Sequence, residues 1–208
     1  MKKLLMAMLA LAFLTMASCT SEPSKPALTG TPQPKAAESE TGRYAFQKLY
    51  IAARGWARDA QAFRLESQLM PDSRGKDGKS DVWRASFASP AGRSAKPYVW
   101  SGTDVPDSPP RGISPGTEDT YSPTNASTQI FDIAFLKVDS DKALEVAKQH
   151  GGDKVIEKAP DTPILYVLDW NRATSELTWH VIFGTSRDDA KLRIAVNATS
   201  GEFIRVEK

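Results

Sequence analysis

The sequence contains few of the residues on which most enzymatic chemistries depend. Its 208 residues include one cysteine and two histidines, so thiol, zinc and histidine-based catalysis have almost no candidates. The formal net charge is only +2, and without Lys2 and Lys3 the 25 basic side chains equal the 25 acidic ones. Such a balance lacks the basic footprint of a nucleic-acid-binding protein. A folded core is not excluded, because 40% of the residues are apolar.

Motifs for nucleotides, metals or a catalytic nucleophile are also missing. The chain has no Gly-x-Gly-x-x-Gly, P-loop or His-Glu-x-x-His pattern, and no Gly-x-Ser-x-Gly elbow. The polar turn from Asp72 to Asp81 lacks the carboxylate spacing of a calcium-binding EF-hand. We therefore expect a protein without enzymatic activity, metal or cofactor. A hydrolase that uses carboxylates or a serine outside these motifs is the alternative.

The first 19 residues have the pattern of an export signal. Two lysines precede an apolar run that is shorter than the roughly 20 residues of a membrane-spanning helix. The run ends in Met16-Ala17-Ser18-Cys19, which resembles the lipobox of bacterial lipoproteins, although Leu is usual where Met16 stands. The resemblance implies a signal peptide over 1–18, and diacylglycerol and an N-acyl chain such as palmitate on Cys19. An ordinary signal peptide with a stray cysteine is the alternative.

The residues after Cys19 indicate in which membrane the protein is anchored and how far the folded part lies from it. In such lipoproteins an aspartate directly after the cysteine favours the inner membrane. Thr20 and Ser21 follow here, so the resemblance implies the outer membrane in a Gram-negative host. Residues 19–42 contain four prolines and one large apolar side chain, Leu28. Because so little surface can be buried, we expect a disordered tether, about 25–30 Å long on average.

Residues 43–101 are expected to form one helix followed by antiparallel strands. Apolar residues at helical spacing predict a helix over residues 43–58. Residues 61–70 fit either an extension of this helix or a strand. Alternating and β-branched or aromatic residues predict strands over 82–87 and 96–101.

Residues 129–208 repeat this order of helix and strands. Asp139 is placed to cap a helix that ends at Gly151-Gly152. The strands expected after this helix cover residues 164–170, 177–184, 191–197 and 202–206. Each stretch therefore predicts a helix packed on one face of an antiparallel sheet, which is an α+β architecture.

Short residue matches indicate that the second unit duplicates the first. The segment Trp83-Arg84-Ala85-Ser86-Phe87 aligns with Trp179-His180-Val181-Ile182-Phe183, and each follows a helix at a similar distance. Chance similarity is the alternative. The two units, 43–101 and 129–208, are separated by residues 102–128, which contain five prolines. We expect a structureless linker there, with a binding loop as the alternative.

The end of the second unit carries a family resemblance. The helix ending at Gly151-Gly152 and the segment from Ile194 through Gly201 to Phe203 resemble the PepSY domain. Asn197 and Ser200 replace its usual Asp and Thr. The resemblance implies a three- to four-stranded antiparallel sheet and an inhibitory or interaction role in the cell envelope, without catalytic residues. A cystatin-like sheet of another family would look similar at this level.

Two tryptophans are the candidate partner-binding residues. Most of the five tryptophans are expected in the core, but Trp100 and Trp170 end their strands and are expected to be exposed. His150 is expected at a helix C-terminus and His180 on a sheet face, neither in a catalytic role. Exposed sheet edges offer a second route to partners, because an edge can accept a strand.

Together these features predict a lipid-anchored protein of the bacterial cell envelope. Its expected contacts are the membrane, through the lipid on Cys19, and a protein partner such as a peptidase, but no nucleic acid. The predicted role is to bind or modulate that partner. A structural lipoprotein that contacts the cell wall is a further alternative.

Overall fold

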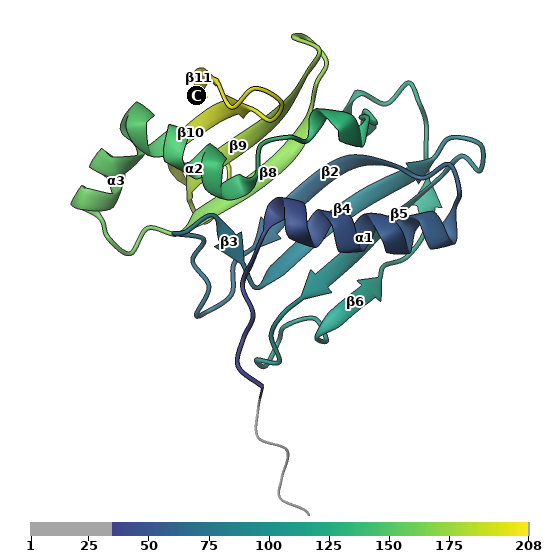
Figure 1. The fold of residues 1–208 in the computed structure, drawn as a ribbon, viewed down its shortest axis with the longest axis horizontal. Helices are drawn as coiled ribbons and strands as arrows, with labels where there is room; N and C mark the ends of the chain where they lie inside the picture. Colours follow the sequence, from purple (N-terminus) through teal and green to yellow (C-terminus); the bar gives the residue numbers. More distant parts are fainter. Residues whose placement is uncertain (1–34, 208) are drawn as a thin grey trace, which may run out of the picture. The chain divides into compact units, whose positions relative to one another are not determined.

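One continuous antiparallel sheet and three α-helices dominate residues 35–207, the part of the chain that the computed structural model describes. The helices lie on one face of the sheet (Figure 1), so the predicted α+β class is confirmed. The predicted signal peptide, Cys19 and residues 20–34 lie outside the described residues. No described helix has the length and apolar character needed to cross a membrane.

The first half of the sheet follows the order expected from the sequence. Helix α1 (Gly42–Trp56) buries one stripe that includes Phe46 and Leu49. The ambiguous stretch after it is strand β2 (Gln61–Gln68), followed by β4 (Val82–Ser89) and β5 (Ser94–Ser101). On β4 the alternating Trp83, Ala85 and Phe87 are fully buried toward the helix, as the period of a strand requires.

The segment expected as a linker adds strands to the sheet. Residues 102–128 contain β6 (Gly112–Pro115) and β7 (Asp119–Thr120), and both pair with β5. The expectation of a structureless stretch is therefore wrong for these residues. A one-turn 3-10 helix, Ala126–Thr128, follows and is capped by the side chain of Asn125.

The last residues of the predicted tether are held by the folded part. Strand β1 (Glu40–Thr41) pairs with β3 (Lys79–Ser80), and the Glu38 amide donates to the Gly102 carbonyl at 2.9 Å. The Arg111 guanidinium donates to the carbonyls of Lys35 and Ala36, both at 3.0 Å. Disorder up to residue 42, as predicted, is therefore wrong for residues 38–42.

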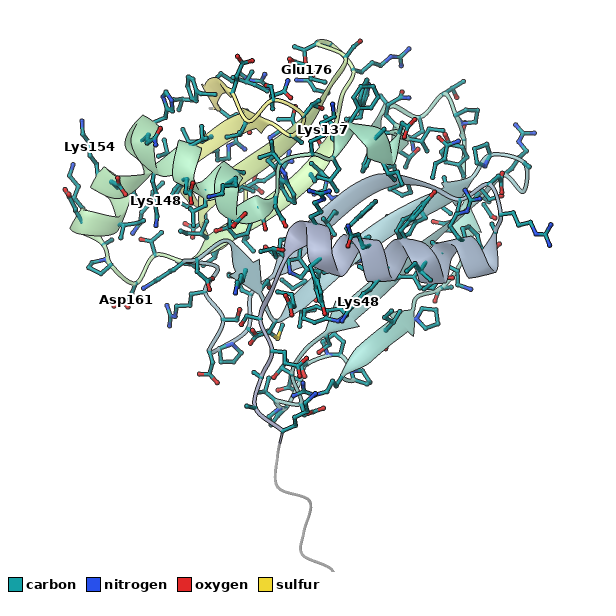
Figure 2. All side chains as sticks on the ribbon, in the orientation of Figure 1. Lys48, Lys137, Lys148, Lys154, Asp161 and Glu176 are labelled. Atoms are coloured by element: carbon teal, nitrogen blue, oxygen red, sulfur yellow. The ribbon has the colours of Figure 1, made fainter. Side chains whose placement is uncertain are left out.

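The second half begins with a helix that bends where an end was predicted. After a 3-10 turn (Ile133–Phe135), helix α2 (Ser140–Ala147) continues through a kinked segment (Lys148–Gly152) into α3 (Asp153–Lys158). Gly151 has a φ of 116°, which interrupts the helix locally, but the chain resumes a helix after it. Charged side chains such as Lys154 project from the outer surface of these helices (Figure 2).

Four strands complete the second half and confirm the expected ones. They are β8 (Ile164–Asn171), β9 (Glu176–Gly184), β10 (Ala190–Asn197) and β11 (Phe203–Glu207). The order across the large sheet is β11-β10-β9-β8-β2-β4-β5-β6, with β7 also on β5. Each half is therefore a meander, and the two halves meet at β8 and β2.

The two aligned tryptophans make the same contact in both halves. The Trp83 indole N–H donates to the Glu40 carbonyl at 2.8 Å, and that of Trp179 donates to the Val138 carbonyl at 2.9 Å. Each carbonyl lies two residues before the first residue of its helix. The two indoles also contact each other edge to face, with ring centroids 6.4 Å apart.

Asp139 caps α2 as predicted, and it also serves α1. Its Oδ1 accepts from the amides of Ser140 at 2.7 Å and Arg43 at 2.8 Å, and its Oδ2 accepts from the Thr41 hydroxyl at 2.7 Å. The Gly42 amide donates to the Ser140 hydroxyl at 2.8 Å. The N-termini of α1 and α2 therefore meet at one carboxylate, where both helix dipoles favour negative charge.

Candidate functional site

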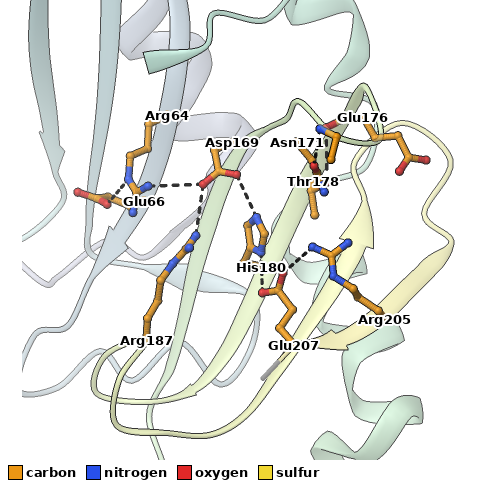
Figure 3. A network of polar contacts seen from close by, with 11 residues as sticks. Arg64, Glu66, Asp169, Asn171, Glu176, Thr178, His180, Arg187, Arg205 and Glu207 are labelled. Atoms are coloured by element: carbon orange, nitrogen blue, oxygen red, sulfur yellow. Dashed lines mark hydrogen bonds and ion pairs between the residues drawn. The ribbon is translucent and has the colours of Figure 1, made fainter. Parts of the chain in front are cut away.

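The sheet face opposite the helices carries charged side chains from several neighbouring strands. Alternation along β4 turns Arg84 away from the buried Trp83, and alternation along β9 turns His180 away from Trp179. Strand register places Arg64 of β2 opposite Asp169 of β8. The connected side chains, drawn in Figure 3, are Arg64, Glu66, Asp169, His180, Arg187, Arg205 and Glu207, named here the charged network.

Asp169 is the centre of the charged network. One carboxylate oxygen, Oδ1, is 3.0 Å from Nε2 of His180. The other, Oδ2, accepts from Arg187 at 3.3 Å and from Arg64 at 3.5 Å. Arg64 also donates from Nε to Glu66 at 2.7 Å. Asp169 thereby joins the first half of the sheet, through β2, to the second half.

His180 is held between two carboxylates. The side chain is buried, with 6% of the residue exposed, and its Nδ1 lies 2.8 Å from Oε2 of Glu207 while Nε2 faces Asp169. Because a carboxylate only accepts hydrogen bonds, this geometry requires a proton on both ring nitrogens. Burial lowers the pKa of His180, but the hydrogen bonds and charges of Asp169 and Glu207 outweigh it and raise the pKa overall.

The two carboxylates respond in the opposite direction. Burial raises the pKa of Asp169 and of Glu207, but the hydrogen bond and charge of His180 outweigh it, so both pKa values fall below their ordinary range. Arg187 contributes its charge to both shifts, and Arg205 lies 3.1 Å from Glu207. The imidazolium form of His180 and the ionised forms of both carboxylates are therefore favoured over a wider pH range than in the free side chains.

A small cavity adjoins the charged network where β2 and β8 stop pairing. The two strands share only the pairs from Arg64 and Asp169 to Glu66 and Val167. Beyond them, Ala62 of β2 pairs instead with Phe131 in an isolated bridge. The resulting cavity has a volume of about 220 Å3, and its lining residues are Phe63, Arg64, Ala126, Ser127, Gln129, Asp169 and Trp170. We call it the junction cavity.

Of the two candidate tryptophans, Trp170 borders the junction cavity, although strand alternation turns its ring to the helix side of the sheet, against the core. Trp170 is half-buried, lines the junction cavity, and packs on Phe135 with ring centroids 5.3 Å apart. Its indole N–H makes no hydrogen bond with any described residue, whereas those of Trp56, Trp83 and Trp179 each have a partner.

Trp100 does not belong to the site, and its expected exposure is wrong. Only 4% of the residue is exposed, and the side chain is part of the core on the helix side of the sheet. The reason is that the chain after β5 does not leave the sheet. Strand β6 returns along β5 and places Ile113 opposite Trp100.

Other candidate positions from the sequence lie elsewhere. His150 is in the kinked segment between α2 and α3, where its ring stacks on Phe203 with centroids 3.8 Å apart. Among residues 35–207 no group of three or more His, Cys, Asp or Glu side chains has the arrangement of a metal site. One sheet edge is the short β6, which ends in Pro115, and the other is β11.

Sequence reasoning placed His180 on a sheet face but missed its partners. Arg64 and Asp169 are 105 residues apart, and His180 and Glu207 are 27 apart. A local sequence pattern cannot reveal contacts between residues that are so far apart in the chain. The one available signal was strand alternation, which turns His180 away from Trp179 and Val181.

Comparisons with known proteins bear on the fold alone. No protein-family model matches the chain, and no curated protein matches it in sequence. A crystal structure of a "putative lipoprotein" from Clostridium difficile 630 is similar, with a TM-score of 0.51 and 10% identity. The similarity covers 78% of this chain and 91% of that one. The α+β architecture therefore recurs in a protein of very different sequence.

Proposed function

We propose that this protein is a lipid-anchored component of the bacterial cell envelope that binds another envelope protein and catalyses no reaction. The anchor would be the acylated Cys19, as the lipobox resemblance of residues 16–19 implies. A protein with a similar fold that is described as a lipoprotein supports this assignment. The binding surface would be the sheet face that carries the charged network and the junction cavity.

The observation that carries the proposal is the mutual pairing of the charged groups. A general base needs a free lone pair, but both nitrogens of His180 face carboxylates. Asp169 is likewise engaged through both oxygens. Side chains fixed by one another in this way form a preorganised surface, which suits recognition because little conformational freedom is lost on binding.

The two halves are proposed to be PepSY-like units that arose by duplication. Two features support this: the helix-then-meander order of each half, and the matching contacts of Trp83 and Trp179 with the carbonyl before each helix. The resemblance at residues 194–203 adds to them. PepSY-like units in envelope proteins would fit an inhibitory or interaction role, with a peptidase as a candidate partner.

Site-specific crosslinking in cells tests the binding role on the intact anchored protein. A photoreactive residue at Arg84 would probe the charged face, and one at Ile51, which is 73% exposed on α1, would serve as the matched control. We expect one envelope protein to be captured reproducibly from position 84 and not from position 51. The same set of proteins from both positions, or none from position 84, would overturn the proposal.

Two further measurements separate the rival functions. Cys19→Ala should release the protein from the membrane fraction, whereas unchanged membrane association would show that the anchor assignment is wrong. The purified full-length protein should show no turnover with ester, peptide and glycoside substrates. Robust turnover that survives purification would replace the binding role with an enzymatic one.

A further inference from the structure

The junction cavity has the size of a single side chain. Its volume of about 220 Å3 is below the roughly 300–1,000 Å3 that is typical of pockets for whole small molecules. Its lining comes from β2, β8 and the 3-10 turn at 126–128, three segments that are distant in sequence. A cavity of this size on a protein-binding face would receive one residue of the partner.

The lining offers hydrogen-bond donors that have no partner among the described residues. Arg64 uses Nε for Glu66 and Nη1 for Asp169, which leaves Nη2 unused. The hydroxyl of Ser127 and the amide of Gln129 also lack side-chain partners there. The carboxylate in the lining, Asp169, is already engaged through both oxygens, so the spare capacity of the charged groups is for donating.

The surrounding charge favours an anion. The charged network contains four cations, since His180 is protonated, and three carboxylates. The neighbouring Arg84 is exposed and makes no ion pair with the described residues. The exposed lining of the cavity is mostly polar, and Phe63 supplies the apolar part against which the methylene groups of a ligand would pack.

We propose that the junction cavity binds a glutamate side chain of the partner protein. The carboxylate would accept from the Arg64 guanidinium and the Ser127 hydroxyl, and the aliphatic stem would lie along Phe63. This inference rests on the proposed binding function and specifies the chemistry that the partner presents. An arginine–carboxylate contact at a partly desolvated position provides specificity as well as affinity.

A blocked amino acid isolates this contact from the rest of the interface. The probe is N-acetyl-glutamate methylamide at millimolar concentration, and the control is the isosteric N-acetyl-glutamine methylamide. Binding is followed by NMR of the full-length protein in detergent, which gives one indole N–H signal for each of the five tryptophans. The variant Trp170→Phe identifies the signal of Trp170. We expect the glutamate probe to shift the Trp170 signal saturably, and the glutamine probe to bind at least 10-fold more weakly.

Matched variants locate the anion contact. Arg64→Gln should abolish the shift of the Trp170 signal, while Lys154→Gln, on the outer surface of helix α3, should leave it unchanged. The other four indole signals report whether each variant is folded. Equal binding of the glutamate and glutamine probes, or a shift that survives Arg64→Gln in a folded protein, would overturn the inference.

The same variant in cells distinguishes failure of this inference from failure of the proposed function. With the photoreactive residue at position 84, Arg64→Gln should reduce capture of the partner at least 10-fold. Undiminished capture would contradict the glutamate site and leave the binding function standing. Absence of any partner in the wild type would instead contradict the binding function, whatever the probe does.

Discussion

The two halves of the sheet agree on the face that meets the helices and differ on the opposite face. Trp83 and Trp179 occupy matching positions and donate to matching carbonyls. The next residue in each strand points the other way. In the first half it is Arg84, which is exposed and makes no ion pair with described residues; in the second it is His180, buried between two carboxylates. The residues on the helix side form the core in both halves, whereas the residues on the opposite face differ between them.

The helices show the same contrast in a smaller form. In the first half Phe87 packs against the ring of Phe46, with centroids 5.9 Å apart, under an unbroken α1. In the second half a Cβ on Gly152 would come within 2.4 Å of Phe183, so the backbone of the kinked segment lies directly on that ring. The aligned phenylalanines are therefore covered by a side chain in one half and by backbone in the other.

The largest expected effect comes from removing either aligned tryptophan. Trp83→Ala and Trp179→Ala should each lower the free energy of unfolding by about 3–5 kcal/mol, because each leaves a large cavity and an unpaired carbonyl. Urea unfolding of the two variants would measure this. A difference of more than about 2 kcal/mol between them would break the equivalence of the two halves.

Replacing the residues next to the tryptophans should separate the two halves. His180→Gln should lower the free energy of unfolding by about 3 kcal/mol near pH 6, since it removes a charged group that pairs with two carboxylates. Arg84→Gln, at the aligned position, should change it by less than about 0.5 kcal/mol. Equal effects of His180→Gln and Arg84→Gln on the free energy of unfolding would show that ion pairing on the sheet face opposite the helices does not distinguish the two halves.

The effect of His180→Gln on the free energy of unfolding should depend on pH, in the way that the pKa shifts of His180, Asp169 and Glu207 indicate. The raised pKa of His180 means that its contribution is complete below its ordinary pKa of about 6.5 and is lost as the pH rises through the higher folded value. The lowered pKa values of Asp169 and Glu207 mean that theirs is lost as the pH falls below about 4. The gap between wild type and His180→Gln should therefore be widest between about pH 4.5 and 6.5.

A glycine at the meeting point of the halves should have a smaller effect. A Cβ on Gly42 would lie 2.6 Å from the Trp179 ring and 3.0 Å from that of Trp83, so Gly42→Ala should cost about 2 kcal/mol. Gly55→Ala, in the same helix with no atom within 4 Å of its Cβ, should instead stabilise by about 0.5–1 kcal/mol. Thermal unfolding of the pair gives the comparison, and a neutral Gly42→Ala would mean that the indoles readjust freely.

The smallest expected effect comes from the shared helix cap. Asp139→Ala should lower the free energy of unfolding by about 1–2 kcal/mol, because the first turns of both α1 and α2 lose an acceptor. Asp132→Ala, which removes the cap of a one-turn 3-10 helix, is the matched control and should cost less. Hydrogen exchange should report faster opening at both helix N-termini; a change confined to α2 would contradict the shared role.

How much the sequence predicts depends on whether the signal is local. The strand that contains Trp179, the cap at Asp139 and the break at Gly151 follow from residues a few positions apart, and the structure has all three. The continuation into α3 does not follow, because it depends on the close approach of backbone to Phe183. The expected exposure of Trp100 at its strand end was also wrong, since β6, in the segment expected to be structureless, pairs with β5 beside it.

The candidate site was less predictable than the fold. Trp170 was identified from its place at a strand end, but nothing near it in sequence points to Arg64 or to the 3-10 turn at 126–128. The site exists because β2 and β8 pair over three residues and then part. That register is decided by packing across the sheet, which no short pattern encodes.

The hold of Arg111 on the chain ahead of β1 has a mechanical consequence. A force that pulls on residue 35 first meets the bonds from Arg111 to the carbonyls of Lys35 and Ala36, and then the bond from Glu38 to Gly102. Only after these break does the load reach β1 and helix α1. The Nε of Arg111 also donates a hydrogen bond to Oδ2 of Asp104 at 2.6 Å. Tension on the chain before β1 would therefore break the hydrogen bonds of Arg111 and Glu38 before it disturbs the strands that carry the charged network.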